Sequence, residues 1–497
     1  MINKRILTVL FIIEVALSSC SFPAQSQPPN TTTPFPDQPG SQPIPLMDVP
    51  TPLPIRPAYK PGEQVDYIAQ SGDTVAALAA RFNTSAAEIM AANPIIPSDA
   101  TTMPPGLPMK IPIYFKSLWA SPYKIIPDGA FINGPMQIGF NTPAFVASQP
   151  GWLKGYSAYA GSGPKLTGAE IVDYVSTNWS VSPRLLLALL EYRTGALSKP
   201  QAPTDPYMLG YQQTYYEGLY LQLVLAANTF NNGYYGWRAG KLTEFDLPDG
   251  TIIRPDPWQN AASVGIQYFF SRFQNNPDYD RSTGPSGLIQ TYRSLFGDPW
   301  ANAIDPVPGS LKQPALRLPF PDGQLWTFTG GPHTGWGVGD PFAAIDFAPP
   351  SEHHGCFTAD PQNFSVAMSD GLVIRSGPDG IAVDLDGDGD ERTGWVIFYL
   401  HLAADTRAPL GRQLHAGDFI GFPSCQGGEA TGTHVHIARK YNGEWILADG
   451  PLAFNMQDWI THSTGVAYKG TLTRGGEIVT ACDCSDAASQ IRSDPKP

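Results

Sequence analysis

The sequence predicts a multidomain α+β protein with a small βααβ module, a mostly α-helical middle domain and a β-rich, antiparallel C-terminal domain. Three observations support this prediction. The chain has 497 residues, enough for several domains of about 100–200 residues each. Its 51 prolines are too many for one compact globule. Helical periodicity marks the middle of the chain, and strand-like alternation marks the region towards its C-terminal end.

Composition narrows the class of protein. Hydrophobic residues make up 42% of the chain and charged residues 15%, so the apolar content is too high for a disordered protein. The formal net charge is −13. A low charge density with an acidic excess argues against phosphate binding, so no nucleic-acid partner is expected. Five cysteines are too few for a small disulfide scaffold of this length.

The N-terminal segment predicts the compartment. Lys4 and Arg5 precede an apolar run, Ile6 to Leu17, that is short for a bilayer span. Leu-Ser-Ser-Cys follows and ends at Cys20, which resembles a bacterial lipoprotein signal. The resemblance implies removal of residues 1–19, lipidation of Cys20 and an extracytoplasmic protein anchored to a membrane of the cell envelope. The alternative is an ordinary secretion signal in which Cys20 has no role.

Residues 20–62 are predicted to form a linker. The segment is rich in Pro, Ser, Thr and Gln, a composition that cannot bury a core and favours extended, polyproline-like conformations. At about 3 Å per residue, roughly forty residues reach on the order of 100 Å. Such a linker would hold the following domains away from the membrane.

Residues 63–116 are predicted to form the small module. Residues 67–74, which end in Gly72-Asp73-Thr74, are predicted to form a strand and a turn, and two short helices follow at 75–81 and 85–92. Asn93-Pro94 then ends the second helix and a strand closes the unit. This order resembles a LysM domain, which implies binding to the N-acetylglucosamine backbone of peptidoglycan or chitin. The expected glycan-binding residues are Gly72, Asp73, Thr74, Asn93, Pro94 and Ile95. The alternative is that these are only turn residues of an unrelated small fold.

Residues 117–310 are predicted to be helical. The amphipathic stretches are Gly168–Trp179, Pro183–Tyr192, Tyr215–Thr229 and Trp258–Phe273. Residues 181–197 resemble the catalytic helix of lysozyme-like lytic transglycosylases, but Arg193 stands at the position of the acidic glutamate before Thr194. Arginine does not give up its proton at ordinary pH. We therefore expect a degenerate, non-cleaving glycan-binding or spacer domain. The alternative is lysozyme-type chemistry through Glu191 or Glu217.

Residues 311–460 are predicted to carry the chemistry. Four histidines and one aspartate fall in three blocks surrounded by strand-like stretches: Gly-Gly-Pro-His ending at His333 with Ile-Asp-Phe around Asp346, Tyr-Leu-His ending at His401, and His434-Val-His436. Alternate residues of a strand point to one face, so His434 and His436 should project together. Two imidazoles and a carboxylate can form a tetrahedral zinc site with one open position.

The three blocks in this order resemble the lysostaphin-type zinc endopeptidases that cut peptidoglycan peptides, and the long first interval is similar to their beta-lytic branch. The resemblance implies zinc ligands His333, Asp346 and His436. It also implies that His401 and His434 are catalytic, with His434 as general base and His401 as transition-state stabiliser, or the reverse. Asp340 is the competing carboxylate, but Asp346 lies in the Asp-Phe-Ala-Pro sequence that fits the family motif.

Two further features leave alternatives open. The acidic run from Asp384 resembles a Ca²⁺ loop, although Trp395 stands at the twelfth position; the alternative is a solvated acidic hairpin. The expected calcium ligands are Asp384, Asp386, Asp388 and Asp390. A disulfide between Cys356 and Cys425 is compatible with an oxidising compartment. Cys482 and Cys484 are open to three states: a mutual disulfide, metal binding or free thiols.

The leading hypothesis is a secreted zinc endopeptidase that hydrolyses peptide bonds of peptidoglycan and is targeted by the LysM module. One alternative is a non-catalytic wall-binding scaffold or an activator of another hydrolase. The other is a lytic transglycosylase, which Arg193 disfavours. Residues 461–497 are treated as a C-terminal extension.

Overall fold

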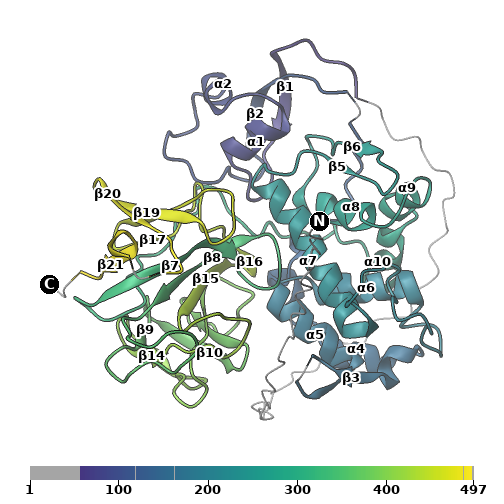
Figure 1. Ribbon diagram of the computed structural model, residues 1–497. Coiled ribbons are helices and arrows are strands. Elements are labelled where there is room, and N and C mark those ends of the chain that lie inside the picture. The colour runs from purple at the N-terminus through teal and green to yellow at the C-terminus, as the bar shows by residue number, and fades with distance from the viewer. Residues whose placement is uncertain (1–55, 118, 162, 485, 495–497) are drawn as a thin grey trace, which may run out of the picture.

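The computed structural model describes residues 56–117, 119–161, 163–484 and 486–494. The predicted signal segment, Cys20 and most of the proline-rich linker lie outside these residues. No helix within the described ranges is long and apolar enough to cross a membrane. Figure 1 shows three parts: a small module at the top, a helical layer on one side and a β-rich layer on the other.

The small module has the predicted βααβ order. Its elements are β1 (Glu63–Ile68), α1 (Val75–Arg81), α2 (Ala86–Ala92) and β2 (Pro108–Ile113). The two strands pair antiparallel, with Val65 opposite Ile111. The side chain of Thr74 caps α1, and Ser85 forms a capping box with Glu88 at the start of α2. These caps satisfy backbone N–H groups that a helix start leaves free.

The middle region is helical, as predicted. Its main helices are α5 (Gly168–Trp179), α6 (Pro183–Thr194), α7 (Gly218–Arg238), α8 (Ala261–Ser271) and α10 (Leu288–Phe296). Shorter elements complete it: α3 (Asp128–Phe131), η1 (Pro135–Gln137), α4 (Thr142–Ser148), η2 (Trp152–Gly155), β3 (Ser157–Tyr159), β4 (Lys165–Thr167), β5 (Phe245–Asp246), β6 (Ile252–Ile253) and α9 (Asp278–Thr283). The prediction for α5 matches its bounds, whereas α7 continues nine residues beyond the predicted end at Thr229.

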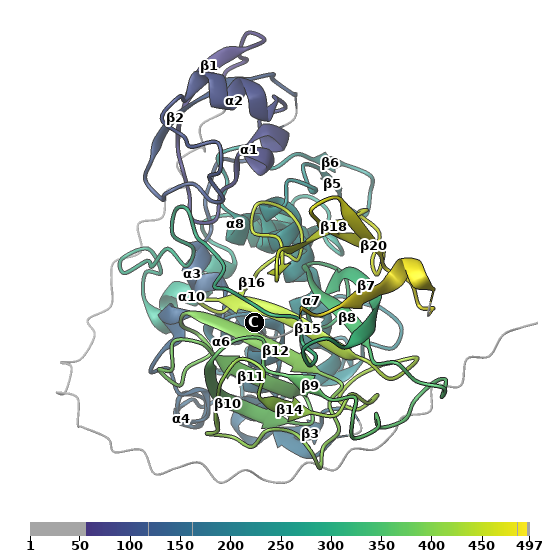
Figure 2. The same cartoon turned by 90° about the vertical axis from the view of Figure 1, so that its left-hand side faces the viewer.

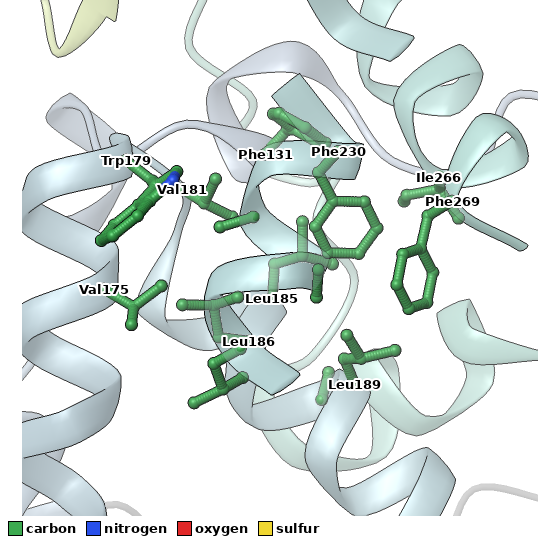
Figure 3. Close-up of a cluster of buried hydrophobic side chains, with 14 of the residues drawn as sticks. Phe131, Val175, Trp179, Val181, Leu185, Leu186, Leu189, Phe230, Ile266 and Phe269 are labelled. Carbon is green, nitrogen blue, oxygen red and sulfur yellow. The ribbon is translucent and has the colours of Figure 1, made fainter. Parts of the chain in front are cut away.

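The helices pack around an apolar core. Figure 3 shows Leu185 and Leu189 of α6 on the side of Phe230 of α7 and Phe269 of α8, and Leu186 on the side of Val175 of α5. These side chains are almost completely buried. Burial of apolar side chains removes them from water and is the main force that holds such a layer together.

A nine-stranded antiparallel sheet forms the β-rich part. Its order is β13-β10-β11-β12-β15-β8-β7-β21, and β16 pairs with β15 outside that path. Its strands are β7 (Leu325–Thr334), β8 (Phe342–Ala348), β10 (Gly371–Gly377), β11 (Gly380–Asp384), β12 (Trp395–Leu400), β13 (Gln413–Leu414), β15 (Val435–Tyr441), β16 (Glu444–Trp445) and β21 (Gln490–Arg492). The central strands β12, β15 and β8 place the second and third histidine blocks beside Asp346.

The two faces of this sheet have different neighbours. On β8, Ile345 and Phe347 belong to the core of the β-rich part. Ala344, which alternates with them, belongs instead to the core of the helical layer. Since successive side chains of a strand point to opposite faces, Asp346 shares the face of Ala344. The predicted metal site therefore lies on the sheet face that the helical layer covers, and Figure 2 shows the large sheet in front with the helices behind it.

The predicted C-terminal extension completes the β-rich part. A four-stranded sheet has the order β17-β18-β19-β20, and β21 pairs with β7 of the large sheet. The remaining elements are β9 (Ser365–Val366), β14 (Phe419–Gly421), β17 (Asn455–Met456), β18 (Trp459–Ser463), β19 (Gly470–Arg474), β20 (Glu477–Thr480) and η3 (Ala487–Ser489). Disulfides join Cys356 to Cys425, as expected, and Cys482 to Cys484.

Buried polar contacts connect the three parts. Arg238 at the end of α7 forms ion pairs with Glu444 of β16 at 2.9 Å and with Asp128 of α3 at 3.2 Å. Arg238 also packs against the small module, because a side chain at Gly72 would lie 2.4 Å from its Nη1 atom. A single buried cation thus contacts all three parts of the molecule.

Candidate metal centre

Three side chains from different strands meet at the predicted zinc site. Nε2 of His333 lies 3.0 Å from Nδ1 of His436. Oδ1 of Asp346 lies 3.3 Å from each of these nitrogens. A zinc ion bound at about 2.0–2.1 Å by tetrahedral ligands separates neighbouring ligand atoms by roughly 3.3 Å. The three atoms therefore have the spacing that a bound zinc ion requires.

The strand register explains how the sequence builds this triangle. Asp346 of β8 lies directly opposite His436 of β15. Gly330 lies opposite Asp346 on β7, at an irregular register that turns His333 towards it. A side chain at Gly330 would lie 2.2 Å from Oδ2 of Asp346. The Gly-Gly-Pro-His sequence thus provides the space that the carboxylate occupies.

Backbone carbonyls fix the orientation of the two histidine ligands. Nδ1 of His333 is 2.8 Å from the carbonyl of Gly331, and Nε2 of His436 is 3.1 Å from the carbonyl of Gly335. A carbonyl only accepts hydrogen bonds, so these nitrogens carry the ring protons. In the neutral rings, the two nitrogens that face each other both present lone pairs. A cation between them removes this repulsion, and the second nitrogen of a metal-bound histidine is usually held in this way.

The carboxylate of Asp346 also fits a metal ligand. Its Oδ1 atom is buried and accepts no hydrogen bond from the described residues. Burial alone would raise the pKa of Asp346, but the facing His333 and His434 hold that pKa well below its usual value. Asp346 is thus a buried anion, and a buried charge needs a partner such as a metal ion.

His401 and His434 lie next to the triangle. Their ring centroids are 4.4 Å apart, and Nε2 of His434 is 3.8 Å from Oδ1 of Asp346. Nδ1 of His401 donates to the carbonyl of Gln426 at 3.0 Å, and Nδ1 of His434 donates to Gly432 at 2.7 Å. Burial, and then the neighbouring histidines, lower the pKa of His401 to about 3. His401 is therefore neutral near pH 7 and presents a free lone pair on Nε2.

Tyr468 is a site residue that the sequence did not predict. It lies between β18 and β19, and its ring stacks on His333 with centroids 4.2 Å apart. Its backbone is bonded to the Gly-Gly-Pro-His segment, since Gly331 donates to the Tyr468 carbonyl at 3.0 Å. Tyr468 is 54% exposed, so it forms part of the accessible wall of the site. No motif surrounds it that sequence reasoning could have used.

The predicted glycan-binding residues divide into two groups. Gly72, Asp73 and Asn93 are buried, and Thr74 caps α1. Asp73 forms an ion pair with Arg81 at 2.6 Å, and Asn93 bonds to the backbone of Lys110 at 2.7 and 2.8 Å. These residues thus contribute to the internal structure of the module.

Pro94 and Ile95 form the second group and are exposed, with Ile95 at 77%. They are the members of the predicted set that remain accessible to a ligand.

Three of the four predicted calcium ligands lie together. Carboxylate oxygens of Asp384, Asp386 and Asp388 lie within 4.8 Å of one another. Burial raises the pKa of Asp384 to about 6. Asp390 does not join them, because its carboxylate forms an ion pair with Arg392 at 2.6 Å.

The helical part lacks lysozyme-type geometry at the expected position. The carboxylate of Glu191 accepts hydrogen bonds from the backbone of Leu197 at 2.7 Å and the hydroxyl of Ser198 at 2.5 Å. Nε of Arg193 donates to the Leu209 carbonyl at 2.8 Å. Glu217 accepts from Tyr207 at 3.1 Å. A pocket of about 360 Å³ beside Glu191 contains no second acidic residue in its lining. Both glutamates thus make local hydrogen bonds.

Comparison with known families assigns a class to two parts of the chain. Residues 67–112 match the family model of the LysM domain. Residues 124–308 match the family model described as the LasA N-terminal domain. The helical part is therefore similar to the N-terminal domain of LasA.

Individual relatives extend this similarity into the β-rich part. Protease LasA of Pseudomonas aeruginosa strain PAO1 is 23% identical over 347 residues, which cover 65% of this chain and 75% of the relative. Protease LasA of strain UCBPP-PA14 is 22% identical over 343 residues, with the same coverage.

Two solved structures are also similar. The M23 metalloprotease pseudoalterin has a TM-score of 0.29 and 22% identity, and the match covers 34% of this chain and 96% of that one. The catalytic domain of lysostaphin from Staphylococcus simulans has a TM-score of 0.18 and 20% identity, over 25% of this chain and 89% of that one.

Proposed function

We propose that the protein is a zinc-dependent endopeptidase that hydrolyses peptide bonds of peptidoglycan. The observation that carries the proposal is the triangle formed by Nε2 of His333, Oδ1 of Asp346 and Nδ1 of His436, with separations of 3.0 and 3.3 Å. Two imidazoles and one carboxylate, with an open fourth position, form a catalytic rather than a structural zinc site. The similarity to protease LasA favours peptide bonds over glycan as the substrate.

His333, Asp346 and His436 would hold the zinc ion. When bound, zinc acts as a Lewis acid that polarises a carbonyl and lowers the pKa of a water molecule. Tyr468 and the carbonyls of Gly331 and Gly335 keep the two imidazoles in place.

His434 is the proposed general base. Its Nδ1 proton is held by the Gly432 carbonyl, so Nε2 is free to take a proton from the attacking water and then to deliver it to the leaving amine. His401 is a weak base, because burial lowers its pKa to about 3. Its neutral Nε2 accepts a hydrogen bond and orients the water or the substrate N–H. The expected role of His401 as a donor to the oxyanion would require a protonated ring.

The small module would hold the enzyme on its substrate. Of the predicted glycan contacts, exposed Pro94 and Ile95 are the residues that we propose to touch the sugar chain. A second binding site raises the local substrate concentration without a new catalytic contact. Export and a lipid anchor at Cys20 are part of the same proposal, and cleavage would then occur in the cell envelope.

The non-catalytic scaffold remains the second candidate function. Gly72 packs against Arg238 of α7, so the small module is a fixed part of a larger body, which would suit a binding protein. The complete set of ligand atoms favours the enzyme.

Product analysis separates these functions. Purified protein is incubated with peptidoglycan, with and without a chelator, and the soluble products are identified by mass. We expect cleaved peptides on intact glycan, loss of cleavage with chelator and no cleavage by His436→Ala. Intact peptides on cleaved glycan would overturn the proposal in favour of a transglycosylase, and no cleavage by the metal-loaded protein would favour the scaffold.

A further inference from the structure

The loop between two proposed zinc ligands is held by the helical part of the molecule. Residues 335–341 connect β7, which carries His333, to β8, which carries Asp346. The loop closes on itself, because the Gly335 N–H donates to the Pro341 carbonyl at 3.1 Å. Its first carbonyl, that of Gly335, accepts the Nε2 proton of His436 at 3.1 Å. The position of the loop therefore decides which nitrogen of His436 is free for a metal.

Two asparagines of α7 bind the backbone of this loop. Oδ1 of Asn228 accepts the Val338 N–H at 3.0 Å, and Oδ1 of Asn232 accepts the Asp340 N–H at 2.7 Å. Asn228 is itself fixed by the indole N–H of Trp179, which donates to the same oxygen at 2.6 Å. Figure 3 shows Trp179 at the edge of the helical core, where its ring is held by apolar neighbours.

The loop sequence permits this close approach. Gly337 has a φ of +87°, and an added Cβ atom would lie 2.3 Å from Oδ1 of Asn228. Gly339 has a φ of +92°, and its Cβ atom would lie 2.1 Å from Oδ1 of Asn232. Both glycines thus meet an asparagine oxygen, and both have a backbone conformation that other residues rarely adopt.

We infer that Asn228 and Asn232 are positioning residues for the metal centre. They hold the 335–341 loop so that the Gly335 carbonyl keeps the proton of His436 on Nε2, which leaves Nδ1 free to bind zinc. The helical part therefore supports the metal site across the domain boundary. This inference rests on the zinc site of the proposed function and adds the residues that set its affinity.

Zinc affinity of the full-length chain tests the inference. It is measured at one pH by competition with a chelator of known affinity. Loss of a group that orients a metal ligand typically weakens metal binding by 10–100-fold. We expect Asn228→Ala and Asn232→Ala to weaken zinc binding by about tenfold. Asn228→Asp keeps an acceptor oxygen and should restore most of the affinity.

The matched control is Gln222→Ala. Gln222 is a buried amide on the same helix, and it bonds only within the helical part, to the backbone of Leu209, Tyr211 and Tyr216. Its loss should lower the stability of the protein and leave the zinc affinity unchanged. A second readout is the solvent exchange of the His436 Nε2 proton in the zinc-loaded protein, followed by NMR. Exchange should be slow in the wild type and in Gln222→Ala, and faster in Asn228→Ala.

Unchanged zinc affinity in both asparagine variants would overturn the inference, as would an equal loss in Gln222→Ala. If Asn228→Ala does not fold, Asn232→Ala decides alone, because Asn232 is only partly buried. Failure of the wild type to bind zinc would instead overturn the proposed metal site itself, so the two failures are distinct.

Discussion

At the scale of single residues, the structure separates side chains that would bind a metal from side chains that would move a proton. His333, Asp346 and His436 point their ligand atoms at one another. His401 and His434 lie beside them, and each has its Nδ1 proton held by a backbone carbonyl. The two groups should therefore respond differently to substitution.

His434→Ala should lower the rate of peptide hydrolysis by about 10²–10⁴-fold, which is the usual contribution of a general base. The zinc content should stay the same, because His434 is not among the three proposed ligands. Rates on peptidoglycan and the metal content of the purified variant measure both effects. His415→Ala is the matched control, since His415 is exposed. Loss of zinc in His434→Ala would show that its assignment is wrong.

Asp173 provides a test of stability against pH that lies away from the metal site. Burial raises the pKa of Asp173 to about 6, whereas its usual value in an unfolded chain is about 3.9. The buried carboxylate thus destabilises the fold fully above about pH 6, and the penalty disappears as the pH falls through about 4. Asp173→Asn should raise the melting temperature at pH 8 and change it little at pH 3.5. An equal rise at both pH values would contradict this account.

The candidate metal ligands were predictable from the sequence, whereas the residues that hold them in position were not. Alternation in His434-Val-His436 and the Gly-Gly-Pro-His block are local signals, so the sequence contains them directly. Tyr468 and Asn228 reach the site only through tertiary packing, and neither lies in a recognisable motif. The buried ion pair of Asp73 with Arg81 was not predictable for the same reason, since a turn residue and a ligand-binding residue look alike in a sequence.

At the scale of elements, the segment between the helical and β-rich parts is attached to the small module. Ser71 donates to the Val307 carbonyl at 3.1 Å and accepts its N–H at 2.9 Å. Thr102 donates to the Pro308 carbonyl at 2.7 Å and accepts the Leu311 N–H at 3.2 Å. The segment between the helical and β-rich parts is therefore an ordered part of the fold.

The double variant Ser71→Ala, Thr102→Val should detach this segment from the small module. It removes four hydrogen bonds that are worth on the order of 1 kcal/mol each. Hydrogen exchange of the Val307 and Leu311 amides should become faster, with little change in the nine-stranded sheet. Thr84→Val is the control, since Thr84 bonds to Glu88 within the module. Exchange rates that stay at wild-type values in the double variant would contradict a role for these bonds.

Element boundaries were predictable where capping signals are present. Thr74, Ser85 and Ser182 each cap the helix that follows. The end of α7 was not predictable, because Asn-Asn-Gly after Thr229 reads as a break. In the structure Asn231 is buried and Asn232 is partly buried, and both asparagines have hydrogen-bond partners outside α7. Tertiary contacts thus override the local preference.

At the scale of the whole molecule, the three parts share buried contacts. The helical core includes Ala344, Phe398 and Trp445 from the large sheet. Arg238 bonds to Glu444 across the same boundary and to Asp128 within the helical part, and the facing anions raise its pKa against the effect of burial. The predicted division into three domains after a linker is therefore incomplete, because the amino-acid composition does not show how domains pack against one another.

Glu444→Gln should lower the free energy of unfolding by about 3 kcal/mol, at the lower end of the cost of breaking a buried ion pair. Asp128 still faces Arg238 in this variant, which limits the loss. Urea denaturation at pH 7 measures the change. Glu477→Gln, at an exposed position on β20, should have no comparable effect. Stability equal to the wild type in Glu444→Gln would mean that the buried pair does not hold the parts together.

The most direct test of the account is a zinc titration of the metal-free protein with peptidoglycan as substrate. We expect no cleaved peptides without metal, and activity that rises with added zinc until one ion is bound per chain. His436→Ala should show neither zinc binding nor cleavage. Full peptide cleavage by the metal-free protein, or one bound zinc with no cleavage, would contradict the proposal that His333, Asp346 and His436 form a catalytic zinc site.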